Sequence, residues 1–286
     1  MIEFVLKGGE KTMGQSLRLA RELDQTLLAV QQLEDYWNEK LSLQWPLSPR
    51  DLRGRGLIHY DNYKKQSGLF GAFCTITMMK ELRSLAKEAG FEAKKPWWIE
   101  VCGIGLASRD LRWLGSAVDV GFNLRARDIS SVAIERARKV FHEYISNDRL
   151  DVIAGEIEDT WESIPIDPKK TVVYFASQFF QIFSRKKMRK TLGHLGHILG
   201  QCPKGSRIKP RIYLVHPLPE DNTGPKSWNG VDLPGVQWGD TTPYSLEELR
   251  EAVERQLEGK KVAIEALSKQ LFYHQTYTFL KITIAS

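Results

Sequence analysis

The sequence has little cysteine and no long apolar run, and each absence removes a class of protein. Its three cysteines, Cys74, Cys102 and Cys202, are scattered, so they form neither a disulfide framework nor a zinc-binding spacing. The longest apolar stretch, residues 68–79, is shorter than the ~18 residues that a membrane-spanning helix needs. The N-terminus carries Glu3 and lacks the apolar core of a secretion signal. We therefore expect a soluble, cytoplasmic protein without a membrane partner.

The rest of the composition is typical of a globular protein. Hydrophobic residues make up 42% and charged residues 27% of the 286 positions, which excludes disordered and fibrous classes. The net charge of +6 is concentrated in one place, because residues 184–211 contain nine basic side chains and no acid. We call residues 184–211 the basic segment. Its charge suits an acidic partner such as RNA, or simply the solvated face of a surface helix.

The pattern of apolar residues changes near residue 95. Before that point, helical spacing predicts helices over residues 16–41 and 70–89. After it, strands and helices alternate, which predicts a mostly parallel α/β sheet covered on both faces. The expected strands are 97–102, 122–128, 150–154, 171–176 and 208–215, and the expected helices are 108–114, 130–141 and 188–199. A loop over 217–243, a capping box at Ser245 and β-rich sequence over 271–273 and 276–284 follow.

A glycine turn follows the first strand of the alternating region. Gly103 and Gly105 stand between a predicted strand and a predicted helix, where glycine lets a ligand approach the backbone closely. Asp128 closes the next strand, 25 residues after Gly103. In a doubly wound fold, an acid at this place can accept hydrogen bonds from ribose hydroxyls. The turn therefore predicts a nucleoside-containing cofactor, and Ser108 in place of a third glycine disfavours NAD.

Four short motifs follow one another along the second two-thirds of the chain. They are EVCGIGLA at 100–107, RDISSVAI at 127–134, GEIE at 155–158 and TPYSLEEL at 242–249. In this order they resemble the motifs of the class I S-adenosylmethionine-dependent methyltransferases. The resemblance implies S-adenosyl-L-methionine as cofactor. It also implies a Rossmann-like domain over residues 96–286 with a seven-stranded sheet whose last strand is antiparallel. Residues 1–95 would form a helical N-terminal cap or substrate lid.

The resemblance also implies a set of cofactor contacts. The glycine turn would lie under the methionine and the ribose, and Asp128 would hold the ribose hydroxyls. Ile129 and residues 156–157 would border the adenine, and residues 176–177 would line the methionine side. The implied contacts are Glu100, Gly103, Gly105, Ala107, Asp128, Ile129, Glu156, Ile157, Ala176 and Ser177. The two isoleucines could equally be core residues, and Glu156 could be a solvated turn acid.

The glycine turn departs from the family's spacing. The family has an acid followed by glycines two, four and six residues later, whereas Gly103 and Gly105 lie three and five residues after Glu100. Either Val101 stands in the place of the acid and Ala107 in that of the last glycine, or the turn is one residue shorter.

Methyl transfer needs few catalytic side chains. Alignment of nucleophile, methyl and sulfur can supply about 7–11 kcal/mol, and a base is needed only for a protonated acceptor. His216, at the end of the fifth strand, is the first candidate base and His59 the second, although a locally hydrogen-bonded histidine is an equal reading of His216. The candidate acceptor contacts are Tyr60, Tyr63, Gln178, Trp228 and Trp238. His194 and His197 lack a third ligand, so we expect no metal.

Two classes of acceptor compete. The first is a small molecule methylated on oxygen or nitrogen. The second is RNA bound by the basic segment; Ala-Ser-Gln-Phe at 176–179 replaces the N/D-P-P-Y/F tetrad of several nucleic-acid enzymes, which disfavours it. An NAD-dependent oxidoreductase and a non-catalytic member of the fold remain as further alternatives.

Overall fold

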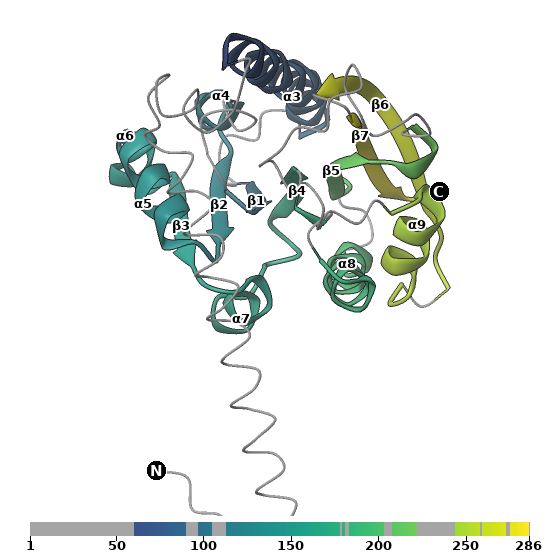
Figure 1. Ribbon diagram of the computed structural model, residues 1–286. Coiled ribbons are helices and arrows are strands. Elements are labelled where there is room, and N and C mark those ends of the chain that lie inside the picture. The colour runs from purple at the N-terminus through teal and green to yellow at the C-terminus, as the bar shows by residue number, and fades with distance from the viewer. Residues whose placement is uncertain are drawn as a thin grey trace, which may run out of the picture.

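The described residues form one mixed sheet with helices on both faces (Figure 1). The structure is a computed structural model that describes residues 60–89, 97–104, 113–177, 179–180, 183–202, 208–221, 244–257, 259–272 and 275–285. The strands are β1 (Trp98–Cys102), β2 (Asn123–Asp128), β3 (Leu150–Ala154), β4 (Thr171–Ser177), β5 (Arg211–Pro217), β6 (Val262–Phe272) and β7 (Gln275–Ile284).

The seven strands lie in the order β3-β2-β1-β4-β5-β7-β6. Strands β1 to β5 are parallel to one another, and β7 runs antiparallel to both β5 and β6. The expected doubly wound sheet, mostly parallel with an antiparallel last strand, is thereby confirmed.

Two layers of helices cover the sheet. Helices α3 (Tyr60–Ala89), α4 (Trp113–Asp119), α5 (Ser131–Val140) and the short α6 (His142–Ser146) lie toward one face. Helices α7 (Ile157–Ser163), α8 (Arg185–Gly200) and α9 (Leu246–Glu254) cover the other. A 3₁₀ turn, η2 (Pro219–Asp221), follows β5. Along β1, Ile99 and Val101 belong to the first core and Cys102 to the second, the alternation expected of a strand buried on both sides.

Helix α3 is part of the sheet's own core. It begins at Tyr60, ten residues before the predicted start at Phe70. The ring of Phe70 meets that of Tyr277 on β7 edge to face, with centroids 5.3 Å apart. Arg211 of β5 donates to Glu88 near the end of α3, at 2.6 Å. Helix α3, which belongs to the predicted cap or lid over residues 1–95, therefore packs into the core of the sheet. Residues 1–59 of that cap, with the predicted helix over 16–41, lie outside the described residues. No helix in the described ranges is long and apolar enough to cross a membrane.

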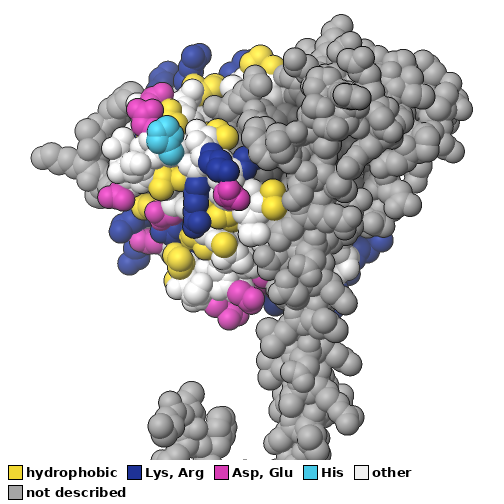
Figure 2. Space-filling model, turned by 60° about the vertical axis from the view of Figure 1, so that its left-hand side comes forward, with side chains coloured by type: hydrophobic (Ala, Val, Ile, Leu, Met, Phe, Trp, Pro, Cys, Tyr) yellow, Lys and Arg dark blue, Asp and Glu magenta, His cyan; other side chains and the backbone are white. Residues whose placement is uncertain are grey.

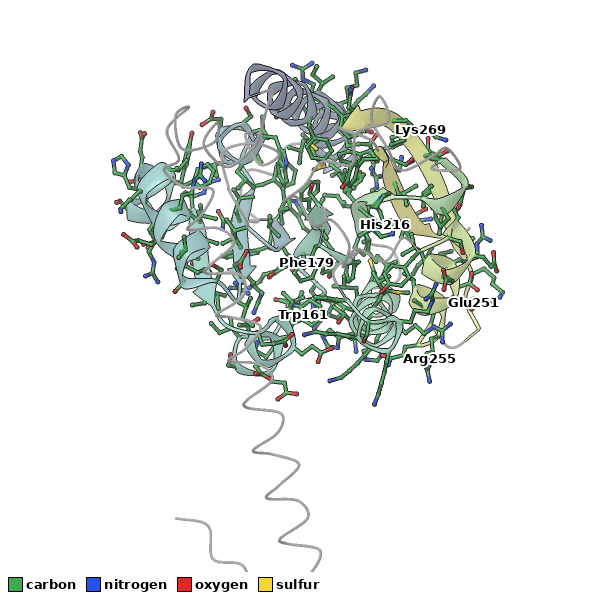
Figure 3. The ribbon with its side chains drawn as sticks, in the orientation of Figure 1. Trp161, Phe179, His216, Glu251, Arg255 and Lys269 are labelled. Atoms are coloured by element: carbon green, nitrogen blue, oxygen red, sulfur yellow. The ribbon has the colours of Figure 1, made fainter. Side chains whose placement is uncertain are left out.

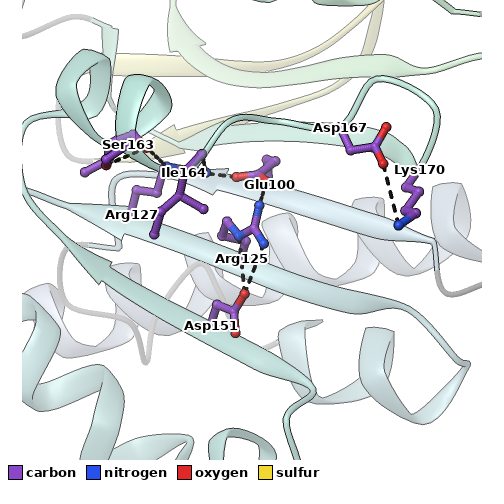
Figure 4. A network of polar contacts seen from close by, with 9 residues as sticks. Glu100, Arg125, Arg127, Asp151, Ser163, Ile164, Asp167 and Lys170 are labelled. Carbon is purple, nitrogen blue, oxygen red and sulfur yellow. Dashed lines mark hydrogen bonds and ion pairs between the residues drawn. The ribbon is translucent and has the colours of Figure 1, made fainter.

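A buried ion pair joins β1, β2 and α7 (Figure 4). Glu100 is 1% exposed, and its Oε2 accepts from Nε of Arg127 at 3.1 Å. The same guanidinium donates to the carbonyls of Thr160 at 2.6 Å and Ile164 at 2.9 Å. A second guanidinium, from Arg125, reaches Oε1 of Glu100 at 3.3 Å. Arg127 therefore caps the C-terminal end of α7, where it adds a donor to the carbonyls of Thr160 and Ile164.

Replacing the central cation tests this network. Arg127→Met removes the partner of one oxygen of buried Glu100 and a donor to each of two carbonyls at the end of α7, so we expect the free energy of unfolding to fall by about 3–5 kcal/mol in urea titrations. The control, Lys139→Met, breaks the exposed pair of Lys139 with Glu135 and should cost less than about 0.5 kcal/mol. Equal small losses in the two variants would show that the buried pair does not stabilise the fold.

Candidate functional site

The carboxyl ends of β2, β1 and β4 meet at one edge of the sheet, where the winding of the fold reverses. After β1 the chain leads to α4, which belongs to the first core. After β4 it leads to α8, which belongs to the second core on the opposite face. In doubly wound sheets, ligands bind at the strand ends beside such a reversal. We therefore expect a ligand to bind at the residues that end these three strands.

Five half-buried residues form the described surface at this edge. They are Gly103 after β1, Asp128 and Ile129 at the end of β2, and Ser177 and Phe179 at the end of β4. Cys102, Arg127 and Ala176, which come directly before these strand ends, are buried. We call these five residues the strand-end surface. Phe179 lies near the middle of the molecule in Figure 3, between the labelled Trp161 and His216.

The carboxylate of Asp128 holds two backbone segments together. Its Oδ2 accepts from the N–H of Ile104, in the glycine turn, at 2.7 Å. Its Oδ1 accepts from the N–H of Ser130 at 2.8 Å, and Ser130 in turn caps α5 by accepting from the N–H of Ala133. One carboxylate therefore fixes the position of the glycine turn after β1 relative to the start of α5.

Gly103 has a conformation and a neighbour that both require glycine. Its φ is +79°, in the left-handed region that side chains disfavour. A Cβ at this position would lie 2.6 Å from Cδ2 of Phe179, so the ring is in close contact with the turn. Phe179 in turn packs against Phe180 and Phe183, with ring centroids 5.3 and 4.7 Å away. Phe179 is not among the site residues predicted from the sequence. The one feature of the sequence that could have indicated it is an aromatic side chain two residues beyond a buried strand.

Several expected cofactor contacts have structural partners instead. Glu100 of β1 is paired with Arg125 and Arg127 of β2 in the buried network. Glu156 caps α7, since its Oε2 accepts from the N–H of Glu158 at 2.8 Å and its Oε1 pairs with Lys187 of α8. Ile157 and Ala176 are buried in the second core. The geometry therefore gives these four residues roles within the fold and favours the core reading of Ile157.

His216 is buried and hydrogen-bonded to the backbone. It is 2% exposed, and its Nε2 accepts from the N–H of Tyr244 at 3.0 Å. Burial lowers the pKa of His216 from its ordinary 6.5 to about 3, so the ring is neutral. A neutral imidazole that accepts at Nε2 carries its proton on Nδ1 and has no second lone pair to offer. The geometry argues against the expected catalytic base and agrees with the alternative, a histidine held by local hydrogen bonds.

The remaining candidates are only partly covered by the described residues. His59, Gly105, Ala107, Gln178, Trp228 and Trp238 lie outside them, and their roles remain predictions. Tyr60 and Tyr63 lie in the first turns of α3, but the described side chains begin further along that helix. His194 stacks on Trp161, with ring centroids 4.7 Å apart. Among the described residues, no three His, Cys, Asp or Glu side chains are grouped to hold a metal ion.

Acids from neighbouring elements offset much of the basic segment. Along α8, Arg185 pairs with Glu248 of α9, while Lys187 and Lys190 pair with Glu156 and Glu158 beside α7. Further along, Arg211 pairs with Glu88 of α3. On the different face shown in Figure 2, basic and acidic side chains are also interspersed. Four of the nine basic side chains are thus already paired, which weakens the case for an RNA-binding surface.

The chain is similar to several solved structures of methyltransferases. One is magnesium protoporphyrin IX methyltransferase (ChlM) from Synechocystis PCC 6803 with bound SAH, at 11% identity and a TM-score of 0.45, over 74% of this chain and 84% of that one. Another is the bifunctional kinase-methyltransferase WbdD, at 11% identity and a TM-score of 0.47, over 71% and 38% of the two chains. A third is N,N-8-amino-8-demethyl-D-riboflavin dimethyltransferase (RosA) from Streptomyces davawensis, at 11% identity and a TM-score of 0.42, over 72% of this chain and 55% of that one.

No protein-family model and no curated protein sequence matches the chain. The identities to the solved structures are too low to transfer residue roles from those proteins.

The buried, neutral His216 predicts a specific pH dependence of stability. Between pH 6.5 and about 3 the unfolded chain binds a proton at this histidine and the folded chain does not. The free energy of unfolding should therefore fall as the pH falls, by up to about 1.4 kcal/mol per pH unit. His216→Gln, which keeps an acceptor for Tyr244, should remove this part of the slope in urea titrations at pH 7, 6, 5 and 4.5. The control His197→Gln, at an exposed histidine, should keep the wild-type dependence of stability on pH. If wild type and His216→Gln lose the same free energy of unfolding as the pH falls, His216 is not the buried neutral group that we infer.

Proposed function

We propose that the chain is an S-adenosylmethionine-dependent methyltransferase that acts on oxygen or nitrogen of a small-molecule acceptor. The observation that carries the proposal is Asp128, a half-buried acid at the end of β2 that is bonded to the turn containing Gly103. An acid at this place in a doubly wound sheet suits a nucleoside whose ribose hydroxyls need an acceptor. The order of the four sequence motifs favours S-adenosylmethionine over other nucleoside cofactors.

The strand-end surface offers an acid, an apolar side chain and a hydroxyl that suit this cofactor. The Asp128 carboxylate would accept from the ribose hydroxyls, Ile129 would pack against the adenine, and Ser177 would lie on the methionine side. When bound, the cofactor supplies an electrophilic methyl group. The residues of this chain would bind and orient it, and such positioning can account for about 7–11 kcal/mol of the barrier. A side chain other than His216 would take the proton of a hydroxyl or ammonium acceptor, or none would be needed.

Binding to the wild-type protein is the first test. By isothermal titration calorimetry, we expect S-adenosylmethionine and S-adenosylhomocysteine to bind and NAD not to bind. Clear binding of NAD alone would favour an oxidoreductase, and binding without methyl transfer to any acceptor in a broad small-molecule screen would favour a non-catalytic member of the fold.

The role of Asp128 is tested in the same titrations. Asp128→Asn keeps the shape of the side chain but removes the charge that strengthens bonds to hydroxyls, so we expect the Kd for S-adenosylhomocysteine to rise about 10- to 100-fold. Asp151→Asn, a change of the same kind on neighbouring β3, should leave that Kd unchanged. Thermal unfolding of each variant separates lost binding from lost structure. Unchanged affinity in a folded Asp128→Asn variant would exclude Asp128 from the site.

The RNA alternative makes an opposite expectation. Because four cations of the basic segment are paired with acids, we expect no RNA binding even at about 50 mM salt in fluorescence anisotropy titrations of single-stranded and hairpin RNA. Binding that weakens steeply toward 200 mM salt would indicate several phosphate contacts and would support RNA as the acceptor.

A further inference from the structure

Phe179 is the member of its aromatic cluster that lies on the strand-end surface. It is half-buried, whereas its neighbours in the aromatic cluster, Phe180 and Phe183, are buried. Its ring is in close contact with Gly103, because Cδ2, Cε2 and Cγ all lie within 3.4 Å of where a Cβ of residue 103 would be. The ring therefore bridges the carboxyl ends of β1 and β4.

The position of Phe179 relative to Asp128 places it beside one part of a bound cofactor. This step rests on the proposed function. The three strand ends follow one another in the order β2, β1, β4, about 4.8 Å apart, and carry Asp128, Gly103 and Phe179 respectively. With the ribose hydroxyls on Asp128 and the adenine packed on Ile129 at the end of β2, the 5′ side of the ribose would point toward β1 and β4. The sulfur is bonded to that 5′ carbon, so it would lie over Gly103 and next to Phe179.

The sulfur of S-adenosylmethionine is a cation, and an aromatic ring attracts cations. A positive group within about 6 Å of a ring centroid gains about 0.5–1 kcal/mol at partly exposed sites. We infer that Phe179 faces the sulfonium and makes the protein prefer the charged cofactor over its neutral product, S-adenosylhomocysteine. Phe179 is in this account a specificity-determining residue.

The charge at sulfur changes during the reaction, which gives this preference a use. The S–CH₃ bond breaks and its electron pair stays on sulfur, while a lone pair of the acceptor forms the new bond to carbon. Positive charge leaves the sulfur for the acceptor, which releases a proton to solvent if it carried one. A ring that attracts only the sulfonium binds the product less tightly than the substrate, so it favours the exchange of S-adenosylhomocysteine for a new cofactor molecule.

The test is the ratio of two dissociation constants in the full-length protein. Phe179→Leu keeps an apolar side chain and removes the aromatic ring. We expect it to raise the Kd for S-adenosylmethionine about two- to fivefold and to leave that for S-adenosylhomocysteine nearly unchanged. Phe179→Tyr, which retains a ring, should keep the wild-type ratio. Phe180→Leu, a change of the same kind in the same cluster but away from Gly103, should lower stability without changing the ratio.

The outcomes separate this inference from the proposed function. If the wild type binds both ligands and Phe179→Leu shifts both constants equally, Phe179 only packs against the turn and the inference is overturned. If the wild type binds neither ligand, the proposed function itself fails. If Phe179→Leu does not fold, trifluorophenylalanine at position 179 keeps the shape of the ring and weakens its attraction for cations. The same selective loss of S-adenosylmethionine binding would then support the inference, and an unchanged ratio would overturn it.

Discussion

The two hydrogen bonds that Asp128 accepts from the backbone fix the geometry on which the site depends. One holds Ile104 and the other Ser130, so a single carboxylate sets the turn after β1 relative to the start of α5. Ile104 and Asp128 are 24 residues apart in the sequence, and they meet because β1 and β2 pair in parallel. A half-buried acid that is pre-oriented in this way binds a further donor without first losing conformational freedom, which is the physical basis for proposing a ribose at this place.

Beneath this surface, polar side chains serve the fold. An acid on a strand that is buried on both faces needs a partner, and Glu100 finds it in Arg127, which also caps α7. His216 accepts from the backbone of Tyr244 beside α9, and Glu156 joins α7 to α8. These residue types occur in many active sites, but here their described contacts stabilise the fold. The strand-end surface is what remains for the proposed binding and orientation of a ligand.

The alternation of apolar residues was enough to predict most of the sheet, and local signals were enough for several helix starts. The bounds of β3 agree with the prediction, and the capping box at Ser245 is present. Strand β6 was expected only from residue 271 but begins at Val262, because a bulge between Ala266 and Ser268 interrupts the period of two along an edge strand. The partners of Glu100 could not be predicted, since they depend on strand register and on the packing of α7. For the same reason the contact of Phe179 with Gly103, across two strands, has no signature in the sequence.

A crystal structure of the protein with S-adenosylhomocysteine tests the central claim most directly. The account predicts the ribose hydroxyls within hydrogen-bonding distance of the Asp128 carboxylate, with the sulfur over Gly103 and beside the ring of Phe179. A ligand bound elsewhere, or bound here with its ribose away from Asp128, would contradict it.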